Sequence, residues 1–280
     1  MNGELDCQRL RGLQLSIALE IRRICRNYNL RCFLVYGSLL GAVRHGGFIP
    51  WDNDMDVGML RRDYDAFAEA CKTDLRPEFL WQSWDTDPAY PFPVGKVRLK
   101  NTHIVESFAP PNVENGIYVD VFPFDAVPDG AWARRVQGWW YYAGKRLLWL
   151  KKGYGRCLLN DSPRQRLRYT AMSFLAGLLP YGWLKRRMAH AMTRFNHLRT
   201  RFVAAPGDWA YVKQFTERAW CEDLVPTRFE GEEFPAFRAA DAYLRHLYGD
   251  YMELPPPEQR GGHAFESIDF GPCAPLADSP

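Results

Sequence analysis

Two short apolar segments of this 280-residue chain contain aspartates that a folded core can hold only at a cost. The first, DMDVGM at residues 54–59, alternates acidic and apolar residues, and the second, GIYVDVF at residues 116–122, places Asp120 among apolar neighbours. Successive side chains of a strand point to opposite faces, so we expect Asp54 and Asp56 to share one face. A fold that buries these carboxylates must offset their charge.

A divalent cation is one way to offset that charge. If the two segments are neighbouring strands, Asp54, Asp56 and Asp120 converge, and a set of oxygen ligands favours magnesium or manganese. In the alternative, residues 52–56 form a solvated acidic turn and Asp120 lies on an edge strand. Two acids separated by one residue are a weak signal alone, so the surrounding sequence must decide.

A glycine-serine turn precedes the acids. Apolar residues at helical spacing predict a helix over residues 8–28, and RCFLVY at residues 31–36 predicts a short strand. Gly37 and Ser38 interrupt this strand before a second helix that begins at Leu39. A strand-to-helix turn presents backbone N–H groups, which suit a phosphate. This turn favours the cation site over the solvated acidic turn.

Composition indicates a globular protein, with 47% hydrophobic and 25% charged residues. The seven cysteines are scattered and include no Cys-x-x-Cys pair, which favours free thiols in a reducing compartment. The N-terminal segment carries acids and arginines where a secretory peptide needs an apolar stretch. We therefore expect a cytoplasmic protein.

The middle of the chain is basic and rich in aromatic residues. From Arg134 to Arg201 there are sixteen basic residues and one acid, Asp161. The uncharged run at residues 169–184 contains Pro180 and is shorter than the roughly 20 residues that span a bilayer, so we expect no transmembrane helix. The segment is either a helical lobe with a solvated basic face or a peripheral contact with an anionic membrane at its inner face. No nucleic-acid recognition motif accompanies it, so we expect no nucleic-acid partner.

The acids belong to a longer pattern. The run YGSLLGAVRHGGFIPWDNDMDV at residues 36–57 resembles the signature of the LicD family, to which fukutin-type proteins are related, within the nucleotidyltransferase superfamily. The resemblance covers most of the chain and continues in KVR at 96–98, NT at 101–102, GIYVDVFPFD at 116–125 and YGDYMELPPPEQRGGH at 248–263. Two positions depart from the family pattern: Asn53 replaces a frequent aspartate, and His263 stands alone where a histidine pair is common.

The resemblance implies an α+β fold, with a nucleotidyltransferase-like core in which helices flank a small mixed sheet, plus a basic helical lobe. We place the catalytic core at residues 1–130 and the basic, aromatic-rich lobe at residues 131–205. Residues 206–280 form a C-terminal segment whose proline-rich tail is expected to pack back on the core.

The resemblance also implies a phosphotransferase that moves a phospho-alcohol, such as phosphocholine, from a CDP-alcohol donor to a hydroxyl of a cell-surface glycan or its lipid-linked precursor. Two metal ions, Mg²⁺ or Mn²⁺, can serve both ends of such a displacement. Asp54 and Asp56 would hold the ions. Asp120 would complete one metal site and accept the proton of the attacking hydroxyl.

The resemblance further implies residues that bind the substrate. Gly37 and Ser38 would bind the diphosphate through N–H groups and hydroxyl. Arg44, Lys96 and Arg98 either offset the phosphate charge or are surface charges, and His263 is a further candidate for substrate binding.

Two further segments have alternative interpretations. Asp52 either caps a loop or supports the ligands, and Trp51 either packs in the core or stacks on the nucleotide base. The prolines at residues 255–257 exclude a helix. The chain beyond them either returns to the site with Arg260 and His263 or forms an ordered tail on the surface.

Three classes of function remain open. The first is the phosphotransferase. The second is another metal-dependent enzyme, either a nucleotidyltransferase that uses a nucleoside triphosphate or a glycosyltransferase that uses a nucleotide-sugar; the Gly37-Ser38 turn upstream of the acids favours the nucleotidyltransferase superfamily. The third is a catalytically inactive binding module, against which the intact Asp54, Asp56 and Asp120 argue.

Overall fold

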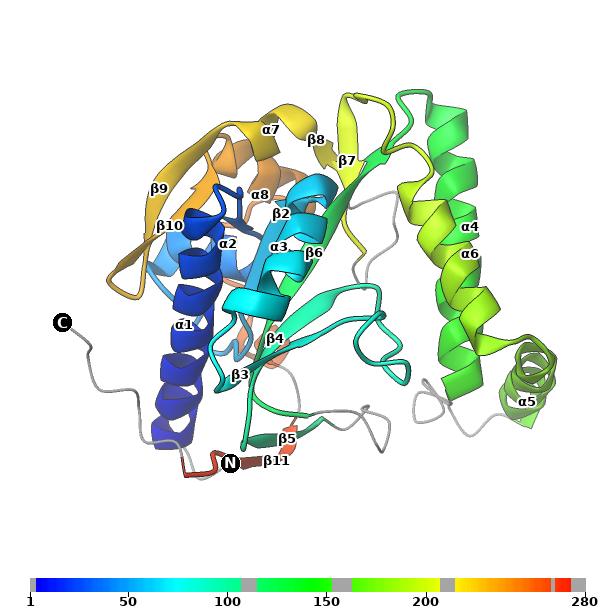
Figure 1. Cartoon of the computed structure of the whole chain (residues 1–280), viewed down its shortest axis with the longest axis horizontal. Helices are drawn as coiled ribbons and strands as arrows, with labels where there is room; N and C mark the ends of the chain where they lie inside the picture. The colour runs from blue at the N-terminus through cyan, green and yellow to red at the C-terminus, as the bar shows by residue number, and fades with distance from the viewer. Residues whose placement is uncertain (1–3, 107–114, 153–162, 207–214, 263–264, 273–280) are drawn as a thin grey trace.

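The computed structural model describes residues 4–106, 115–152, 163–206, 215–262 and 265–272. A mixed sheet lies at its centre (Figure 1). The strand order is β1 (Phe33–Leu34), β2 (Asp56–Leu60), β6 (Tyr118–Val127), β4 (Gly95–Leu99) and β3 (Phe79–Gln82), with β7 (Phe202–Ala204) and β8 (Phe215–Glu217) continuing from the far end of β6. Strands β2 and β6 are parallel, and the other pairs are antiparallel. The predicted α+β class is confirmed.

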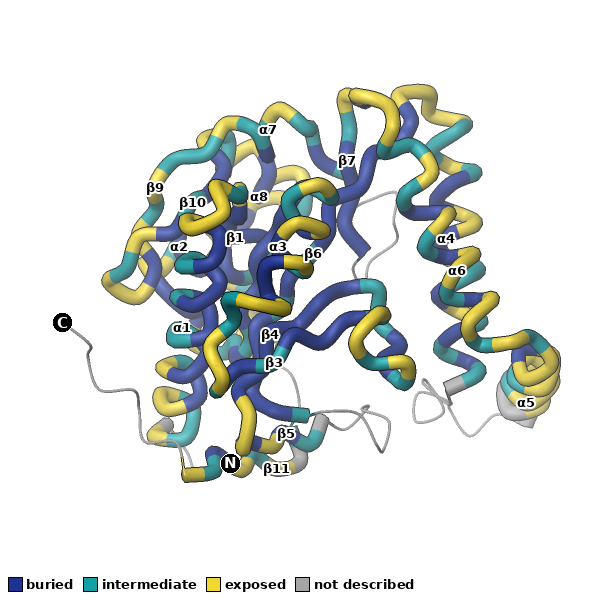
Figure 2. The backbone as a smooth tube through the Cα atoms, viewed as in Figure 1, coloured by how far each residue is buried: buried dark blue, intermediate teal, exposed yellow. Residues whose placement is uncertain are grey.

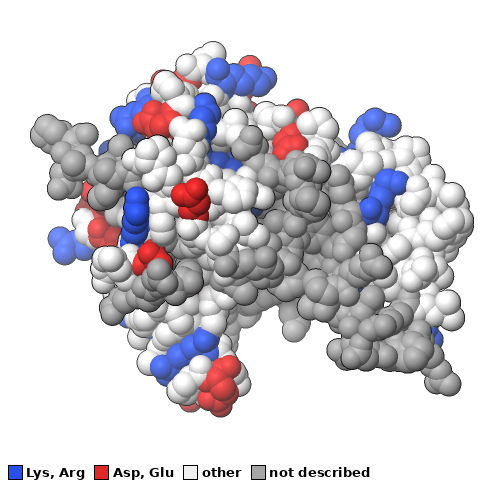
Figure 3. All heavy atoms as spheres, turned by 90° about the horizontal axis from the view of Figure 1, so that it is seen from below, with Lys and Arg blue, Asp and Glu red and all other residues white. Residues whose placement is uncertain are grey.

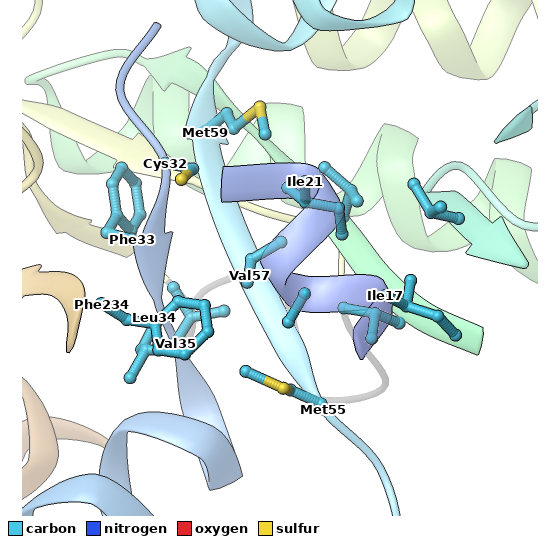
Figure 4. Packing of buried hydrophobic residues seen from close by; sticks show 14 of the residues in the cluster. Ile17, Ile21, Cys32, Phe33, Leu34, Val35, Met55, Val57, Met59 and Phe234 are labelled. Carbon is cyan, nitrogen blue, oxygen red and sulfur yellow. The ribbon is translucent and has the colours of Figure 1, made fainter. Parts of the chain in front are cut away.

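Helices α1 (Glu4–Asn27) and α3 (Arg61–Asp74) pack on one face of the sheet. Helix α1 buries a stripe at a spacing of three and four residues, formed by Leu10, Leu13, Ile17, Ile21 and Ile24. Figure 4 shows two of these isoleucines beside the buried apolar residues of β2. Each such side chain contributes about 1.5–3 kcal/mol when it is fully buried. This packing fixes the position of β2.

The other face of the sheet is covered by α2 (Tyr36–His45), α8 (Ala240–Tyr248) and the hairpin of β9 (Leu224–Phe229) and β10 (Glu232–Phe237). The rings of Phe33 on β1 and Phe237 on β10 lie 4.8 Å apart. The short helix α7 (Arg218–Glu222) leads from β8 into this hairpin. Segments from both ends of the sequence therefore enclose the sheet.

A separate lobe contains α4 (Ala131–Lys152), α5 (Pro163–Leu178) and α6 (Tyr181–Thr193). Its own hydrophobic cluster includes Tyr141 and Leu148 of α4 and Leu184 and Met188 of α6. Figure 2 shows that this lobe exposes more of its surface than the central sheet does. Within the described ranges, no helix is both long enough and apolar enough to cross a bilayer.

Smaller elements complete the described fold. Strand β5 (His103–Glu106) pairs with β11 (Phe265–Asp269), and η2 (Pro257–Gln259) lies between α8 and β11. The five cysteines within the described residues are free thiols, as predicted.

Two local predictions are wrong in extent. The strand predicted at residues 31–36 is limited to β1, and Tyr36 already starts α2. The strand predicted at residues 54–59 begins only at Asp56, so Asp54 lies in the preceding loop. Carbonyl groups of that loop accept hydrogen bonds from side chains of α1 instead of joining a strand.

The close packing of β4 on β3 yields a first prediction. A Cβ atom on Gly95 would lie 2.0 Å from the ring of Trp81, so Gly95→Ala must displace that ring. We expect the substitution to lower the free energy of unfolding by about 1–3 kcal/mol. Gly12 lies on the exposed side of α1, with open space around it. Gly12→Ala should therefore raise the free energy of unfolding by about 0.5–1 kcal/mol. Urea denaturation checks both, and equal stability of the two variants would contradict the packing.

Candidate active site

The parallel pairing of β2 with β6 places Asp56 directly opposite Asp120. The backbone N–H of Asp120 donates to the carbonyl oxygen of Met55 at 3.0 Å. Strand β4 lies on the other side of β6, so Asp120 is in the interior of the sheet. The prediction that the acids come from neighbouring strands is confirmed for this pair, and the edge-strand alternative for Asp120 is wrong.

The Asp56 carboxyl group is buried among other carboxylates. Burial raises the pKa of Asp56 well above its usual range, and the nearby charges of Asp54, Asp120 and Asp52 raise it further. Lys96 lowers this pKa. The cluster therefore has more negative charge than its neighbouring lysine offsets.

The two basic residues predicted on β4 have different surroundings. The ammonium of Lys96 lies 3.0 Å from Oδ1 of Asp120 and 3.2 Å from the centre of the Tyr118 ring. The guanidinium of Arg98 donates through Nε to Gln82 Oε1 and through Nη1 to the carbonyl oxygen of Gly116, both at 2.6 Å. Lys96 therefore lies at the acids, as predicted. Arg98 is instead hydrogen-bonded to β3 and to the loop before β6.

The start of α2 contacts the acids from the other side. The hydroxyl oxygen of Ser38 accepts a hydrogen bond from the N–H of Asp56 at 2.7 Å. A Cβ atom on Gly37 would lie 2.8 Å from Oδ2 of Asp52, so the absence of a side chain leaves room for that carboxylate. Both residues lie in the first turn of the helix, where backbone N–H groups lack partners within the helix. This position suits an anion.

Two residues of α1, which sequence reasoning missed, hold the acidic loop in place. The guanidinium of Arg11 donates to three carbonyl oxygens between residues 49 and 52, at 2.8–2.9 Å. The side chain of Gln14 donates to the carbonyl oxygen of Asn53 at 2.9 Å. These bonds fix the chain immediately before Asp54. No local pattern marks the two residues, because their partners lie about forty positions away.

Two guanidinium groups lie near the indole ring of Trp51. The Cζ atom of Arg260 is 4.9 Å from the ring centre, and that of Arg44 is 5.9 Å from it. Hydrogen bonds to the carbonyl oxygens of Pro255 and Tyr251 anchor them. Burial and then the charge of Arg260 lower the pKa of Arg44. Among the described residues, neither guanidinium has a carboxylate within 4.0 Å, so this pair can receive an anion.

The tail after the prolines returns to the acidic loop, as one of the two interpretations predicted. A Cβ atom on Gly262 would lie 2.7 Å from the carbonyl oxygen of Trp51 and 2.8 Å from Oδ1 of Asn53. Trp51 itself is half-buried and packs against the main core. His263 lies outside the described residues, so its role stays a prediction.

Tyr248, the last residue of α8, is a further candidate that sequence reasoning missed. Burial raises the pKa of its hydroxyl, and the carboxylates of Asp56, Asp52 and Asp54 raise it further. Its ring therefore lies close to the acids. The sequence did contain a signal for this residue, because Tyr248 is the first residue of the motif at 248–263.

The carboxylate oxygens of this site suit a hard cation by their chemistry, but not by their arrangement in this structure. Within the described residues, no three Asp, Glu, His or Cys side chains form a group that could hold a metal ion. The carboxylates near Asp56 are nevertheless oxygen donors with excess negative charge, which magnesium and manganese prefer.

Comparison with known proteins identifies the segment that holds this site. Residues 29–146 match the nucleotidyltransferase domain described as LicD/FKTN/FKRP. This segment is a LicD-family nucleotidyltransferase domain. The resemblance predicted from the motifs is confirmed. The LicD-family domain contains Asp54, Asp56 and Asp120 together with Ser38 and Lys96.

One relative extends the comparison beyond the LicD-family domain, and two others match short segments. The chain is 23% identical over 256 residues to the lipopolysaccharide cholinephosphotransferase LicD of Haemophilus influenzae, a match that covers 89% of this chain and 92% of that protein. It is 56% identical over 34 residues to the human ribitol 5-phosphate transferase FKRP, covering 12% of this chain and 7% of that protein. An uncharacterized protein of Rickettsia prowazekii, RP689, is 49% identical over 35 residues, 12% of this chain and 13% of that protein.

The hydrogen bonds from α1 yield a second prediction. Arg11→Met should lower the free energy of unfolding by about 1.5–3 kcal/mol, because carbonyl groups lose a charged donor. Arg26→Met, at an exposed position of the same helix, is the matched control and should have little effect. Thermal and urea unfolding measure both. Equal stability of Arg11→Met and Arg26→Met would show that the loop does not depend on Arg11.

Proposed function

We propose that this protein is a metal-dependent phosphotransferase that moves a phospho-alcohol, such as phosphocholine, from a CDP-activated donor to a hydroxyl of a cell-surface glycan or its lipid-linked precursor. The observation that carries the proposal is the pairing of the buried Asp56 with the partly exposed Asp120 beside the N-terminus of α2. The names of two relatives, a cholinephosphotransferase and a ribitol 5-phosphate transferase, support the transfer of a phosphorylated alcohol.

Asp54, Asp56 and Asp120 would hold one or two ions of Mg²⁺ or Mn²⁺. Such ions neutralise charge on the phosphate oxygens during a displacement at phosphorus. The crowding that raises the pKa of Asp56 supports this assignment, because a bound cation would relieve it. Asp54 would contribute from the loop immediately before β2.

In the proposed reaction the acceptor oxygen forms a bond to the phosphorus that carries the alcohol. The bond from that phosphorus to the bridging oxygen breaks, and CMP leaves. The proton of the acceptor hydroxyl passes to the carboxylate of Asp120. Lys96, in contact with the same carboxylate, fixes its orientation.

The donor would bind between the start of α2 and the C-terminal tail. The first turn of α2, with Gly37 and Ser38, would bind the diphosphate. Arg44 and Arg260 would offset its charge, because both lie at Trp51 without a carboxylate partner among the described residues. We assign Arg98 a structural role in the sheet, because its guanidinium is hydrogen-bonded to Gln82 and Gly116.

A panel of nucleotides tests the class of donor. Melting temperatures would be compared with CDP-choline, other CDP-alcohols, UDP-glucose and CTP, each with Mg²⁺, Mn²⁺ or EDTA, because a ligand of the native state raises the melting temperature. Metal-dependent stabilisation by a CDP-alcohol, with release of CMP, is expected. Stabilisation by UDP-glucose or CTP alone would instead support a glycosyltransferase or a nucleotidyltransferase. No response to any nucleotide would support an inactive binding module.

The third prediction concerns the metal ligands. Asp54→Asn and Asp56→Asn should each reduce turnover to less than roughly a tenth of the wild-type rate, the loss expected when a catalytic metal is displaced. In EDTA, Asp56→Asn should melt no lower than the wild type, because the substitution removes a buried like charge. The exposed Asp85→Asn serves as the control for both measurements. Turnover close to that of the control would show that these two residues do not bind a catalytic metal ion.

The fourth prediction separates donor binding from transfer. Asp120→Asn should lose transfer and retain some donor binding in titration calorimetry, because the start of α2 and the other acids remain. The single substitution leaves the buried ammonium of Lys96 without its carboxylate, at a cost of about 3–5 kcal/mol in stability. The double variant Asp120→Asn/Lys96→Met removes that penalty and should also be inactive. Normal turnover in either variant would make Asp120 a structural residue.

A further inference from the structure

The helices of the lobe expose an unusual amount of apolar surface. Single exposed apolar side chains are common, whereas a continuous patch marks a binding surface. Ten large side chains of the three helices are more than a third exposed: Trp132, Trp139, Trp140, Tyr142, Leu167, Met172, Phe174, Leu175, Leu178 and Trp183. The apolar surface of the lobe therefore needs a partner.

Helix α4 alternates aromatic and basic residues along one exposed face. The exposed positions Trp132, Arg135, Trp139, Tyr142 and Arg146 recur at a spacing of three and four residues, which places them in one stripe. Arg146 donates to the hydroxyl oxygen of Tyr142 at 3.2 Å. The stripe presents rings and guanidinium groups together.

Helix α5 buries Ala176 and turns its large apolar residues outward. Leu167, Phe174, Leu175 and Leu178 lie on one exposed face by helical spacing, whereas Ala176 on the opposite side is fully buried. Lys151 of α4 donates to the carbonyl oxygen of Gly177 at 2.8 Å, which holds α5 in this orientation. A soluble surface helix has the reverse pattern.

The charge around these apolar faces has one sign. From residue 130 to residue 216, none of the described residues is acidic. Exposed arginines without a described carboxylate partner occur on all three helices: Arg135, Arg146, Arg168, Arg186 and Arg187. Figure 3 shows basic but no acidic side chains on the outer part of the lobe, on the right. A partner that complements this surface is apolar and anionic.

We propose that the outer surface of α4, α5 and α6 docks on an anionic lipid membrane. Phe174, Leu175 and Leu178 would enter the boundary between headgroups and acyl chains, the tryptophans would lie at the headgroup level, and the arginines would contact lipid phosphates. A second copy of the chain fits less well, because a symmetric interface would bring two basic faces together. A soluble acidic glycan would leave the apolar face of α5 uncovered.

Docking in this way would hold the LicD-family domain at the surface where lipid-linked glycan precursors lie. That consequence rests on the proposed function, whereas the docking itself does not. Donor stabilisation in the absence of lipid therefore tests the function separately from the membrane contact.

Co-sedimentation with vesicles tests the docking. The full chain should pellet with vesicles of equal parts phosphatidylglycerol and phosphatidylcholine, and remain in solution with phosphatidylcholine alone. Phe174→Ser/Leu178→Ser should weaken binding by at least about tenfold, because each of these side chains would be buried in the bilayer boundary. Arg135→Gln/Arg146→Gln should weaken it as well, most at low salt.

Matched controls use exposed residues of α1, of the turn that follows it, and of α3. Leu5→Ser/Tyr28→Ser and Arg26→Gln/Arg62→Gln change the same residue classes away from the lobe and should bind as the wild type does. Unchanged melting temperatures confirm that every variant folds. Absence of pelleting at low salt would overturn the proposal, as would equal pelleting of the α5 and α1 variants. Concentration-dependent dimers that the α5 variant abolishes, without vesicle binding, would assign the surface to a second copy.

Discussion

The parallel pairing of β2 with β6 determines where the negative charge of this protein lies. It places Asp56 beside Asp120 in the interior of the sheet, where burial and mutual repulsion raise the pKa of Asp56. The neighbouring elements each direct a polar group to this point: Lys96 from β4, the hydroxyl of Ser38 from α2, and the guanidinium of Arg11 to the loop before the acids.

Shifting β2 by one residue would separate the two carboxylates and turn Met55 and Val57 toward the polar face.

The surrounding core offsets the cost of this arrangement. Repulsion between the buried carboxylate of Asp56 and its acidic neighbours opposes folding, and the apolar stripe of α1 together with the aromatic contacts behind β1 stabilises the same strands. Under the proposed function, a cation bound by these oxygen donors would offset the excess negative charge. Asp56 would then lower the stability of the metal-free protein in favour of ligand binding, a trade-off that is common at functional sites.

Periodicity and spacing predicted the parts of the site that depend on local sequence. The short apolar segments around Asp56 and Asp120 were enough to place each acid on a strand, and the need to offset their charge then favoured neighbouring strands. Contacts between distant segments were not predictable in this way: Arg11 and Gln14 bond a loop about forty residues away and hold Asp54 outside the strand. Arg98 shows the same limit, because only the fold reveals that Gln82 and Gly116 already bind its guanidinium.

The central claim is that the carboxylates around Asp56 bind a divalent cation together with a CDP-alcohol. Electron paramagnetic resonance of Mn²⁺ tests it directly, because bound manganese gives a weaker signal than the free ion. With CDP-choline present, the wild-type protein and the exposed control Asp85→Asn are predicted to bind manganese, and Asp54→Asn and Asp56→Asn are predicted to lose most of that binding. Equal manganese binding by the wild type and Asp56→Asn would contradict the account.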